Sequence, residues 1–358
     1  MTGTNDVPML GKGVYNSQQQ LQREAMLKVL PMLEKSAQEL SSRPTSTEKP
    51  LTIVEYGAAQ GSNSIEPMQT IINNIPGQKP QLLFNDRPNN DFNTLSTTIT
   101  EWTNTLRNTP YIGMIPGSFY NSLLPAKSVD LAFCLTCLQH LSSVPVTHDE
   151  NLLPLPDADK RLQSQAHNDL LIFLQHRAVE VKSGSSLIIC FPSTSPSGHR
   201  NLSGLVASCY GAIREMAEDG RISRKVVSAF QEPVYDRSME DVLKSLVGVS
   251  ELWSTREVFE EWVSHPAIEK LKKAKEANGG EDYEASVEYA DTVIEWLMAV
   301  IGGYFYKALR VGDEEGYTEE RADALYRAFF TRVKELFVLN HRDELVSMSF
   351  IFVWLQRS

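Results

Sequence analysis

Cysteine is scarce in this chain, with 4 residues among 358. A small secreted domain held together by disulfides is therefore excluded, since such folds need a dense cysteine framework. No stretch reaches the ~18 consecutive apolar residues of a membrane-spanning helix, and residues 1–16 show no basic start followed by an apolar run. We therefore expect a protein that has no membrane partner and works in the reducing cytoplasm.

Positive charge is also in short supply. The chain has 34 Lys and Arg against 45 Asp and Glu, a net charge of −11, and a pI near 5.2. Such a surface repels nucleic-acid phosphates, so we expect no nucleic-acid partner. Hydrophobic residues make up 42% and charged residues 22% of the chain, which is typical of a globular protein of about two domains.

The first half of the chain alternates patterns of two kinds. Apolar runs of strand length occur at residues 51–56, 81–86, 129–135 and 186–191. Residues 18–40 carry apolar side chains at every third or fourth position, which predicts an amphipathic helix, and residues 161–181 predict another. Strands that alternate with helices indicate an α/β fold with a doubly wound parallel sheet.

The second half looks different, because residues 201–325 have mostly helical patterns and no obvious parallel strand. Residues 345–355 are again rich in strand-forming side chains. We therefore predict four parts: an N-terminal segment and helix that close the active site, a Rossmann-like core, a mainly helical substrate cap, and C-terminal strands that rejoin the core sheet. Their bounds are 1–50, 51–200, 201–330 and 331–358.

Two acidic residues stand at or near the ends of the first two predicted strands, Glu55 and Asp86, and Gly57 and Gly61 follow the first of them. Ligands of doubly wound sheets bind at the carboxyl ends of the strands, where both acids are expected. Either acid alone could instead cap a helix; the pair favours a ligand. The loop matches no pyrophosphate-binding pattern, so a nucleoside-type ligand such as S-adenosylmethionine fits better.

Five sequence blocks also carry a family resemblance. They are Tyr15 with Gln22, EYGAAQGSN at 55–63, NDRPNNDFN at 85–93, PGSFY at 116–120 and LSSVP at 141–145. Through these blocks the chain resembles the SABATH family of S-adenosylmethionine-dependent methyltransferases, known mainly from plant enzymes that methylate the carboxyl groups of salicylate, jasmonate, benzoate and related acids. The resemblance runs from about residue 10 to residue 200.

The resemblance implies a set of cofactor contacts. Asp86 would hold the ribose hydroxyls, with Arg87 beside the adenosine, and Ser118 and Phe119 would flank the adenine. The methionine half would lie against the remaining residues, which are Tyr15, Gly57, Asn63 and, near its ammonium group, Glu55. The family normally has Asp where Glu55 stands, so its carboxylate is displaced by one methylene.

The resemblance also places Gln22 on the family's substrate-carboxylate glutamine. Its usual partner is a tryptophan, but here that position is His140, preceded by Gln139. An imidazole is smaller than an indole and can become cationic. We therefore expect Gln22, Gln139 and His140 to bind either a flat aromatic acid or, at least as readily, a smaller or more polar acid, including a dicarboxylic one. His140 could alternatively cap a local turn.

The expected activity is therefore methyl-ester formation on a small carboxylic acid, with S-adenosylmethionine as cofactor. Such an acid is already ionised at neutral pH, so we predict no catalytic acid or base. Cys134 and Cys137 form a lone CxxC, which favours packing over a redox or metal site, and no metal is expected. Two alternatives stay open, an N-methyltransferase of a small heterocycle and a non-catalytic relative that binds the cofactor. Family habit implies a homodimer and a role in secondary metabolism.

Overall fold

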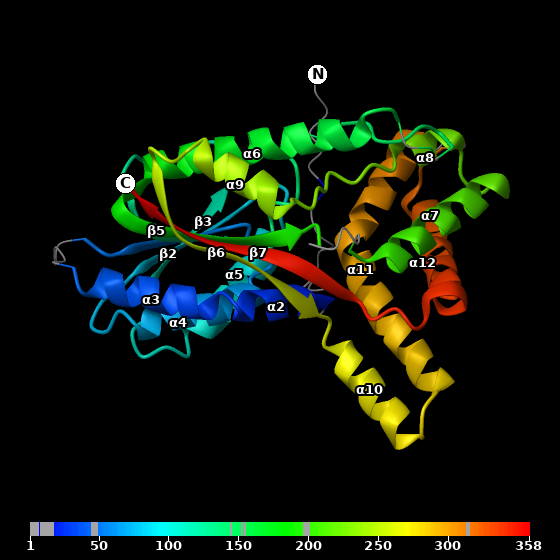
Figure 1. Ribbon diagram of the computed structural model, residues 1–358, viewed down its shortest axis with the longest axis horizontal. Coiled ribbons are helices and arrows are strands. Elements are labelled where there is room, and N and C mark those ends of the chain that lie inside the picture. The colour runs from blue at the N-terminus through cyan, green and yellow to red at the C-terminus, as the bar shows by residue number, and fades with distance from the viewer. Residues whose placement is uncertain are drawn as a thin grey trace.

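The computed structural model describes residues 7, 18–43, 49–143, 145–151, 153, 155–195, 201–312 and 316–358. Its centre is a seven-stranded sheet with the strand order β3-β2-β1-β4-β5-β7-β6 (Figure 1). The strands are β1 Thr52–Tyr56, β2 Gln81–Asp86, β3 Tyr111–Pro116, β4 Val129–Leu135, β5 Val181–Ser193, β6 Trp253–Ser264 and β7 Ser347–Arg357.

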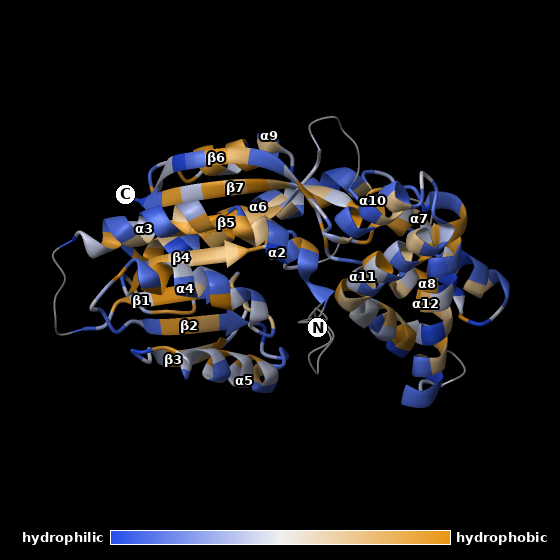
Figure 2. Ribbon diagram, turned by 90° about the horizontal axis from the view of Figure 1, so that it is seen from below, coloured by the Kyte–Doolittle hydropathy of each residue, from blue (hydrophilic) through white to orange (hydrophobic). Residues whose placement is uncertain are grey.

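The strands from β3 to β5 are parallel, and β7 and β6 add an antiparallel edge. The central strands are mostly apolar (Figure 2). Helices cover both of their faces, and every residue of β4 is buried. The predicted α/β class is confirmed. The sheet is mixed rather than all parallel, because β7 and β6 run antiparallel to their neighbours.

Helices lie on both faces of the sheet (Figure 1). One face is covered by α2 Gln20–Leu27, α3 Leu30–Ser41, α4 Ile65–Asn73 and α5 Phe92–Thr103. The other face is covered by α6 Ala158–Glu180 and α9 Met239–Val247. A short 3-10 helix, η1 Ser62–Ser64, connects the β1 loop to α4.

A second group of helices packs beside the carboxyl ends of the parallel strands (Figure 1). Its members are α7 Ser203–Glu218, α8 Arg224–Ala229, α10 Ala267–Ala277, α11 Tyr283–Gly312 and α12 Glu319–His341. One hydrophobic cluster runs from Ile53 in the sheet to Phe305 and Phe337 in this group, so the two regions share a continuous core. The four-part division of the chain stays a prediction.

Three local features differ from the sequence analysis. The edge strands β3 and β6 were not predicted, because each leaves many residues partly exposed and so lacks the apolar run of a buried strand. The expected helix at residues 18–40 is broken at Lys28 and Val29 into α2 and α3. Pro31 in the first turn of α3 explains the break, because proline has no N–H to donate to the preceding turn.

Candidate functional site

A cavity opens at the carboxyl ends of β1, β2 and β4. Strands β2 and β4 flank β1 on opposite sides, so the loops that follow them diverge and leave a crevice. The cavity encloses about 880 Å³ including the space at its open mouth, and α2 and α11 contribute side chains to its wall.

The structure brings most of the predicted site residues to this one cavity. They are Gln22, Glu55, Gly57, Asn63, Asp86, Arg87, Phe119 and His140. Among the described residues that line it, Ser118 and Gln139 do not occur. The side-chain amide of Gln139 instead donates to the carbonyl of Thr136 at 2.7 Å, within the same turn. Tyr15 lies outside the described residues.

Gly57 allows the β1 loop to pass close to the turn after β4. Its φ is +87°, and a Cβ atom there would meet the Sγ of Cys137 at 2.3 Å. The N–H groups of Gly57 and Ala58 both donate to the carbonyl of Asn85, at 2.9 and 3.0 Å. The loop is therefore tied to the end of β2, and no larger residue fits at Gly57.

Asp86 connects the ends of β1 and β2. Its Oδ2 accepts from the backbone N–H of Ala59 at 2.6 Å, and its Oδ1 accepts from the N–H of Arg87 at 2.7 Å. The side chain of Asn90 donates to the carbonyl of Ala59 at 2.6 Å. The carboxylate is thereby held in one orientation at the cavity wall.

Glu55 is a buried carboxyl group at the same wall, with an exposed fraction of 5%. Its Oε2 has no hydrogen-bond partner among the described residues. Burial raises the pKa of Glu55 to about 8, and the nearby charge of Asp86 contributes to the increase. A cationic group in the cavity would both complete its hydrogen bonding and stabilise its ionised form.

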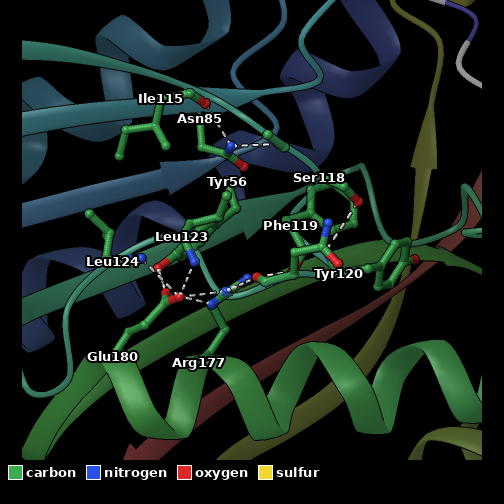
Figure 3. A network of polar contacts seen from close by, with 12 residues as sticks. Tyr56, Asn85, Ile115, Ser118, Phe119, Tyr120, Leu123, Leu124, Arg177 and Glu180 are labelled. Atoms are coloured by element: carbon green, nitrogen blue, oxygen red, sulfur yellow. Dashed lines mark hydrogen bonds and ion pairs between the residues drawn. The ribbon is translucent and has the colours of Figure 1, made fainter.

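Phe119 reaches the cavity from the loop after β3, and a buried network holds this loop (Figure 3). The guanidinium of Arg177 on α6 donates to the carbonyls of Phe119 at 2.5 Å and Asn121 at 2.8 Å. It also binds both carboxylate oxygens of Glu180, at 2.9 and 2.8 Å. Arg177 and Glu180 are completely buried, so their pairing is required for either charge to remain there.

Glu180 extends the network to other parts of the sheet (Figure 3). It accepts from the hydroxyl of Tyr56 at 2.8 Å and from the N–H groups of Leu123 and Leu124 at 2.7 and 3.2 Å. The amide of Asn85 separately donates to the carbonyls of Ile115 and Gly117, both at 2.8 Å. The loop from β3 is thus fixed at several points before any ligand binds.

His140 faces the cavity from the turn after β4. It is 8% exposed, and its Nδ1 has no hydrogen-bond partner among the described residues. Burial lowers the pKa of His140 to about 3, and the positive charge of Arg87 contributes. The imidazole is therefore neutral at pH 7, and it can donate one N–H without carrying a charge.

The backbone of His140 is firmly anchored. Its carbonyl accepts from the hydroxyl of Tyr120 at 2.9 Å, and its N–H donates to the carbonyl of Cys137 at 3.0 Å. The Sγ of Cys137 donates to backbone carbonyls, and all four cysteines are free thiols. Among the described residues, no group of three or more His, Cys, Asp or Glu side chains could hold a metal ion.

Several cavity residues were missed by the sequence analysis. They include Gln19, Met26, Asn89, Asn90, Thr136 and Tyr304. Asn89 and Asn90 lie inside the block that carries the family resemblance, so a closer reading of that block could have found them. Tyr304 lies on α11, far along the chain, and no local pattern marks it.

The cavity suits the expected cofactor in shape and charge. Its wall offers a buried carboxyl group with an unpartnered oxygen, a loop where a Cβ atom would not fit, and the aromatic ring of Phe119. These groups match an ammonium, a close backbone approach and a purine ring, which S-adenosylmethionine combines.

No described helix is both long and apolar enough to cross a membrane.

Comparisons with known proteins agree with this assignment. The chain is 44% identical over 358 residues to Methyltransferase LUC1 of a Fusarium species, covering 99% of this chain and 98% of the relative. It is 38% identical over 367 residues to O-methyltransferase acrG of Aspergillus aculeatus, with the same coverage. The fold matches a solved loganic acid methyltransferase with SAH at a TM-score of 0.75 and 20% identity, over 99% of each chain.

The family model described as SAM dependent carboxyl methyltransferase matches residues 7–357. This match confirms the predicted family, the enzymatic nature of the protein and its cofactor. Because the model and the 44% identical relative both span nearly the whole chain, the protein belongs to the S-adenosylmethionine-dependent carboxyl methyltransferases.

Proposed function

We propose that this enzyme transfers a methyl group to the carboxylate of a small-molecule acid and releases its methyl ester. The observation that carries the proposal is that Gln22 and His140 line the same cavity as Glu55 and Asp86. Two neutral hydrogen-bond donors therefore share one cavity with two carboxyl groups. An anionic acid suits the donors Gln22 and His140. A cationic cofactor suits the carboxyl groups of Glu55 and Asp86.

At the cofactor end, we propose the residue roles that the family resemblance implies. Asp86 binds the ribose hydroxyls with Arg87 beside the adenosine, and Ser118 and Phe119 flank the adenine. Glu55 neutralises the ammonium group. The methionine half contacts Tyr15, Gly57 and Asn63. The cavity position of most of these residues supports the assignment, although Ser118 is not among the described lining residues.

At the acid end, the protein has little chemistry to perform. S-adenosylmethionine, when bound, supplies the methyl group and carries it on a positively charged sulfur. A carboxylic acid with a pKa near its ordinary value of ~4 is already an anion at pH 7, so no general base is required. Gln22 and the neutral His140 donate hydrogen bonds to one carboxylate oxygen and leave the other free as nucleophile. Gln139 acts on the turn that carries His140, through its hydrogen bond to the carbonyl of Thr136.

The contribution of the enzyme is then mainly orientation and exclusion of water. Well-oriented reactants can gain roughly 7–11 kcal/mol relative to free encounter. Helices α2 and α11, which supply Gln22 and Tyr304, form part of the cavity wall. The imidazole of His140 occupies less space than the indole of the family pattern, which favours a small, polar or dicarboxylic acid.

The test is a transfer assay with methyl-labelled cofactor and four acids, namely benzoate, octanoate, N-acetylglycine and succinate. Label in a base-labile product that extracts as an ester establishes carboxyl methylation and ranks the pocket by size and polarity. Label in a base-stable product of an added purine would instead establish N-methylation. Cofactor binding by calorimetry with no transfer to any acceptor would indicate a non-catalytic relative.

We further propose that the enzyme acts in the cytoplasm, as a homodimer, in secondary metabolism. Four free thiols and no disulfide among them fit a reducing compartment. The dimer and the metabolic role rest on the family resemblance. Light scattering of the purified chain tests the first, since a monomer at micromolar concentration would contradict it.

A further inference from the structure

Gln22 has a hydrogen-bond partner on another helix, outside the cavity lining. The indole N–H of Trp296, on α11, donates to the Oε1 of Gln22 on α2 at 2.8 Å, across 274 positions of sequence. Gln22 lines the cavity, whereas Trp296 is 3% exposed and is not among the described lining residues. The indole therefore contacts Gln22 from the side that faces away from the cavity.

The direction of this hydrogen bond decides which end of the amide is available to a ligand. An indole nitrogen can only donate, so it requires the carbonyl oxygen of Gln22 as its acceptor. The other end of the amide is the NH2 group, which carries two donors. The donor end of Gln22 is thus the end left for a group in the cavity, and a carboxylate is an acceptor.

Trp296 is itself held in place. The ring of His265 packs edge-on against it, with 5.8 Å between ring centroids and an interplanar angle of 64°. His265 is anchored through its backbone N–H to the carbonyl of Val346 at 2.9 Å, and its Nδ1 accepts from the N–H of Ala267 at 3.2 Å. The indole therefore needs no rearrangement when a ligand arrives, which lowers the entropy cost of binding.

We propose that Trp296 is a positioning residue that orients the amide of Gln22, so that the cavity presents N–H donors and selects the carboxylate of the acid. This inference rests on the proposed function. If the amide were reversed, its carbonyl oxygen would repel the anion and would favour a ligand that presents an N–H. Trp296 thereby contributes to the choice between an acid and a nitrogen acceptor without touching either.

The main test is Trp296→Phe, assayed with whichever of the four acids gives the most ester. Loss of the indole N–H leaves the ring packing largely intact but lets the amide of Gln22 rotate. The KM for the acid should therefore rise about fivefold, which corresponds to the energy of one neutral hydrogen bond. The dissociation constant for S-adenosylhomocysteine should not change. The matched control is Trp253→Phe, which also loses a buried indole hydrogen bond, to the carbonyl of Leu174 at 3.0 Å, but lies in the other core cluster.

A double-mutant cycle separates positioning from simple packing. In a Gln22→Ala background, Trp296→Phe should raise the KM no further, because there is no amide left to orient. An equal rise in both backgrounds, or an equal rise in Trp253→Phe, would overturn the proposal.

A second variant covers the case in which Trp296→Phe does not fold. Gln22→Glu keeps an acceptor for the indole and replaces the NH2 group by an oxygen, so acid turnover should fall at least as far as in Gln22→Ala. A KM equal to that of the wild type would reject the inference. If the wild type forms ester with no acid at all, the proposed function fails and the inference fails with it. If the wild type forms ester normally and the KM is unchanged in Trp296→Phe and in Gln22→Glu, the role of Trp296 is rejected while the methyl-ester activity stands.

Discussion

At the proposed cofactor end of the cavity, Asp86 comes from a strand end and accepts hydrogen bonds from backbone groups. At the acid end, Gln22 comes from helix α2 and His140 from the turn after β4. Asp86 accepts from two backbone N–H groups, and the loop of Phe119 is bonded to Arg177. Gln22 depends on one side chain from a distant helix, and His140 has an unpartnered Nδ1 among the described residues.

The contrast reflects what each end must recognise. A cofactor with fixed chemistry can be bound by groups built into the sheet, where every displacement would strain several hydrogen bonds. An acid of variable size is better met by a few side chains on helices, which can change without disturbing the sheet. We therefore expect damage at the first end to affect stability and cofactor binding, and damage at the second to affect the acid alone.

The largest effect is expected from Arg177→Met. This change removes one partner of a completely buried ion pair and leaves the charge of Glu180 uncompensated, which costs about 3–5 kcal/mol of the free energy of unfolding. The carbonyl of Phe119 also loses its donor, so the affinity for S-adenosylhomocysteine should fall together with stability. Thermal denaturation and calorimetry measure the two effects.

A matched control is Arg332→Met, since Arg332 pairs with Glu215 and Glu335 while 36% of its side chain is exposed. Its cost should stay below about 1 kcal/mol because solvent already screens the pair. Similar losses in the two variants would mean that the network in Figure 3 has no special importance for the site.

The second effect is expected from Asp86→Ala. The carboxylate accepts two backbone hydrogen bonds and is proposed to bind the ribose, so its removal should weaken S-adenosylhomocysteine binding by about 2–3 kcal/mol, or roughly 100-fold. Asp86→Asn keeps one oxygen acceptor and should fall between Ala and wild type. A folded Asp86→Ala protein with wild-type affinity would contradict the ribose assignment.

The same contrast explains which parts could be predicted from the sequence. Glu55 and Asp86 were found because a buried strand is visible locally, and its last residues must lie at the carboxyl edge of the sheet. Arg177 and Glu180 were missed, since charges on a long helix normally indicate a solvated face. Trp296 could not be found at all, because its contact with Gln22 depends on how α11 packs against α2.

The third effect is expected from Gln22→Ala, which acts at the acid end. The variant loses a hydrogen-bond donor to a charged carboxylate, which costs about 1.5–2 kcal/mol of binding free energy. The KM for the best acid of the panel should therefore rise roughly 20-fold. The affinity for S-adenosylhomocysteine should stay within twofold of the wild type. Gln38→Ala on α3 serves as the control, because the Gln38 amide donates to Glu34 and Asn74 and Gln38 is not among the residues that line the cavity. Parallel loss of acid and cofactor binding in Gln22→Ala would break the division between the two ends.

The smallest effect is a pH dependence of cofactor binding that depends on Glu55. Its pKa of about 8 means that the carboxyl group is mostly protonated at pH 7 in the free enzyme. An ammonium group binds the ionised form, so the affinity for S-adenosylhomocysteine should increase about fivefold, or by about 1 kcal/mol, between pH 7 and pH 8. His140, with a pKa of about 3, stays neutral throughout this range and does not contribute.

Calorimetry in buffers of different ionisation enthalpy would detect the proton that Glu55 releases on binding. In Glu55→Gln the affinity should be lower at pH 8 and nearly independent of pH, because the amide cannot ionise. If the ionised carboxyl group of Glu55 holds the ammonium, the affinity of the wild type must increase with pH. An affinity that does not change with pH in the wild type would therefore contradict the contact between Glu55 and the ammonium group. Asp86 would then remain as the proposed carboxylate contact to the cofactor. The difference between the cofactor end and the acid end would depend on its contact with the ribose alone.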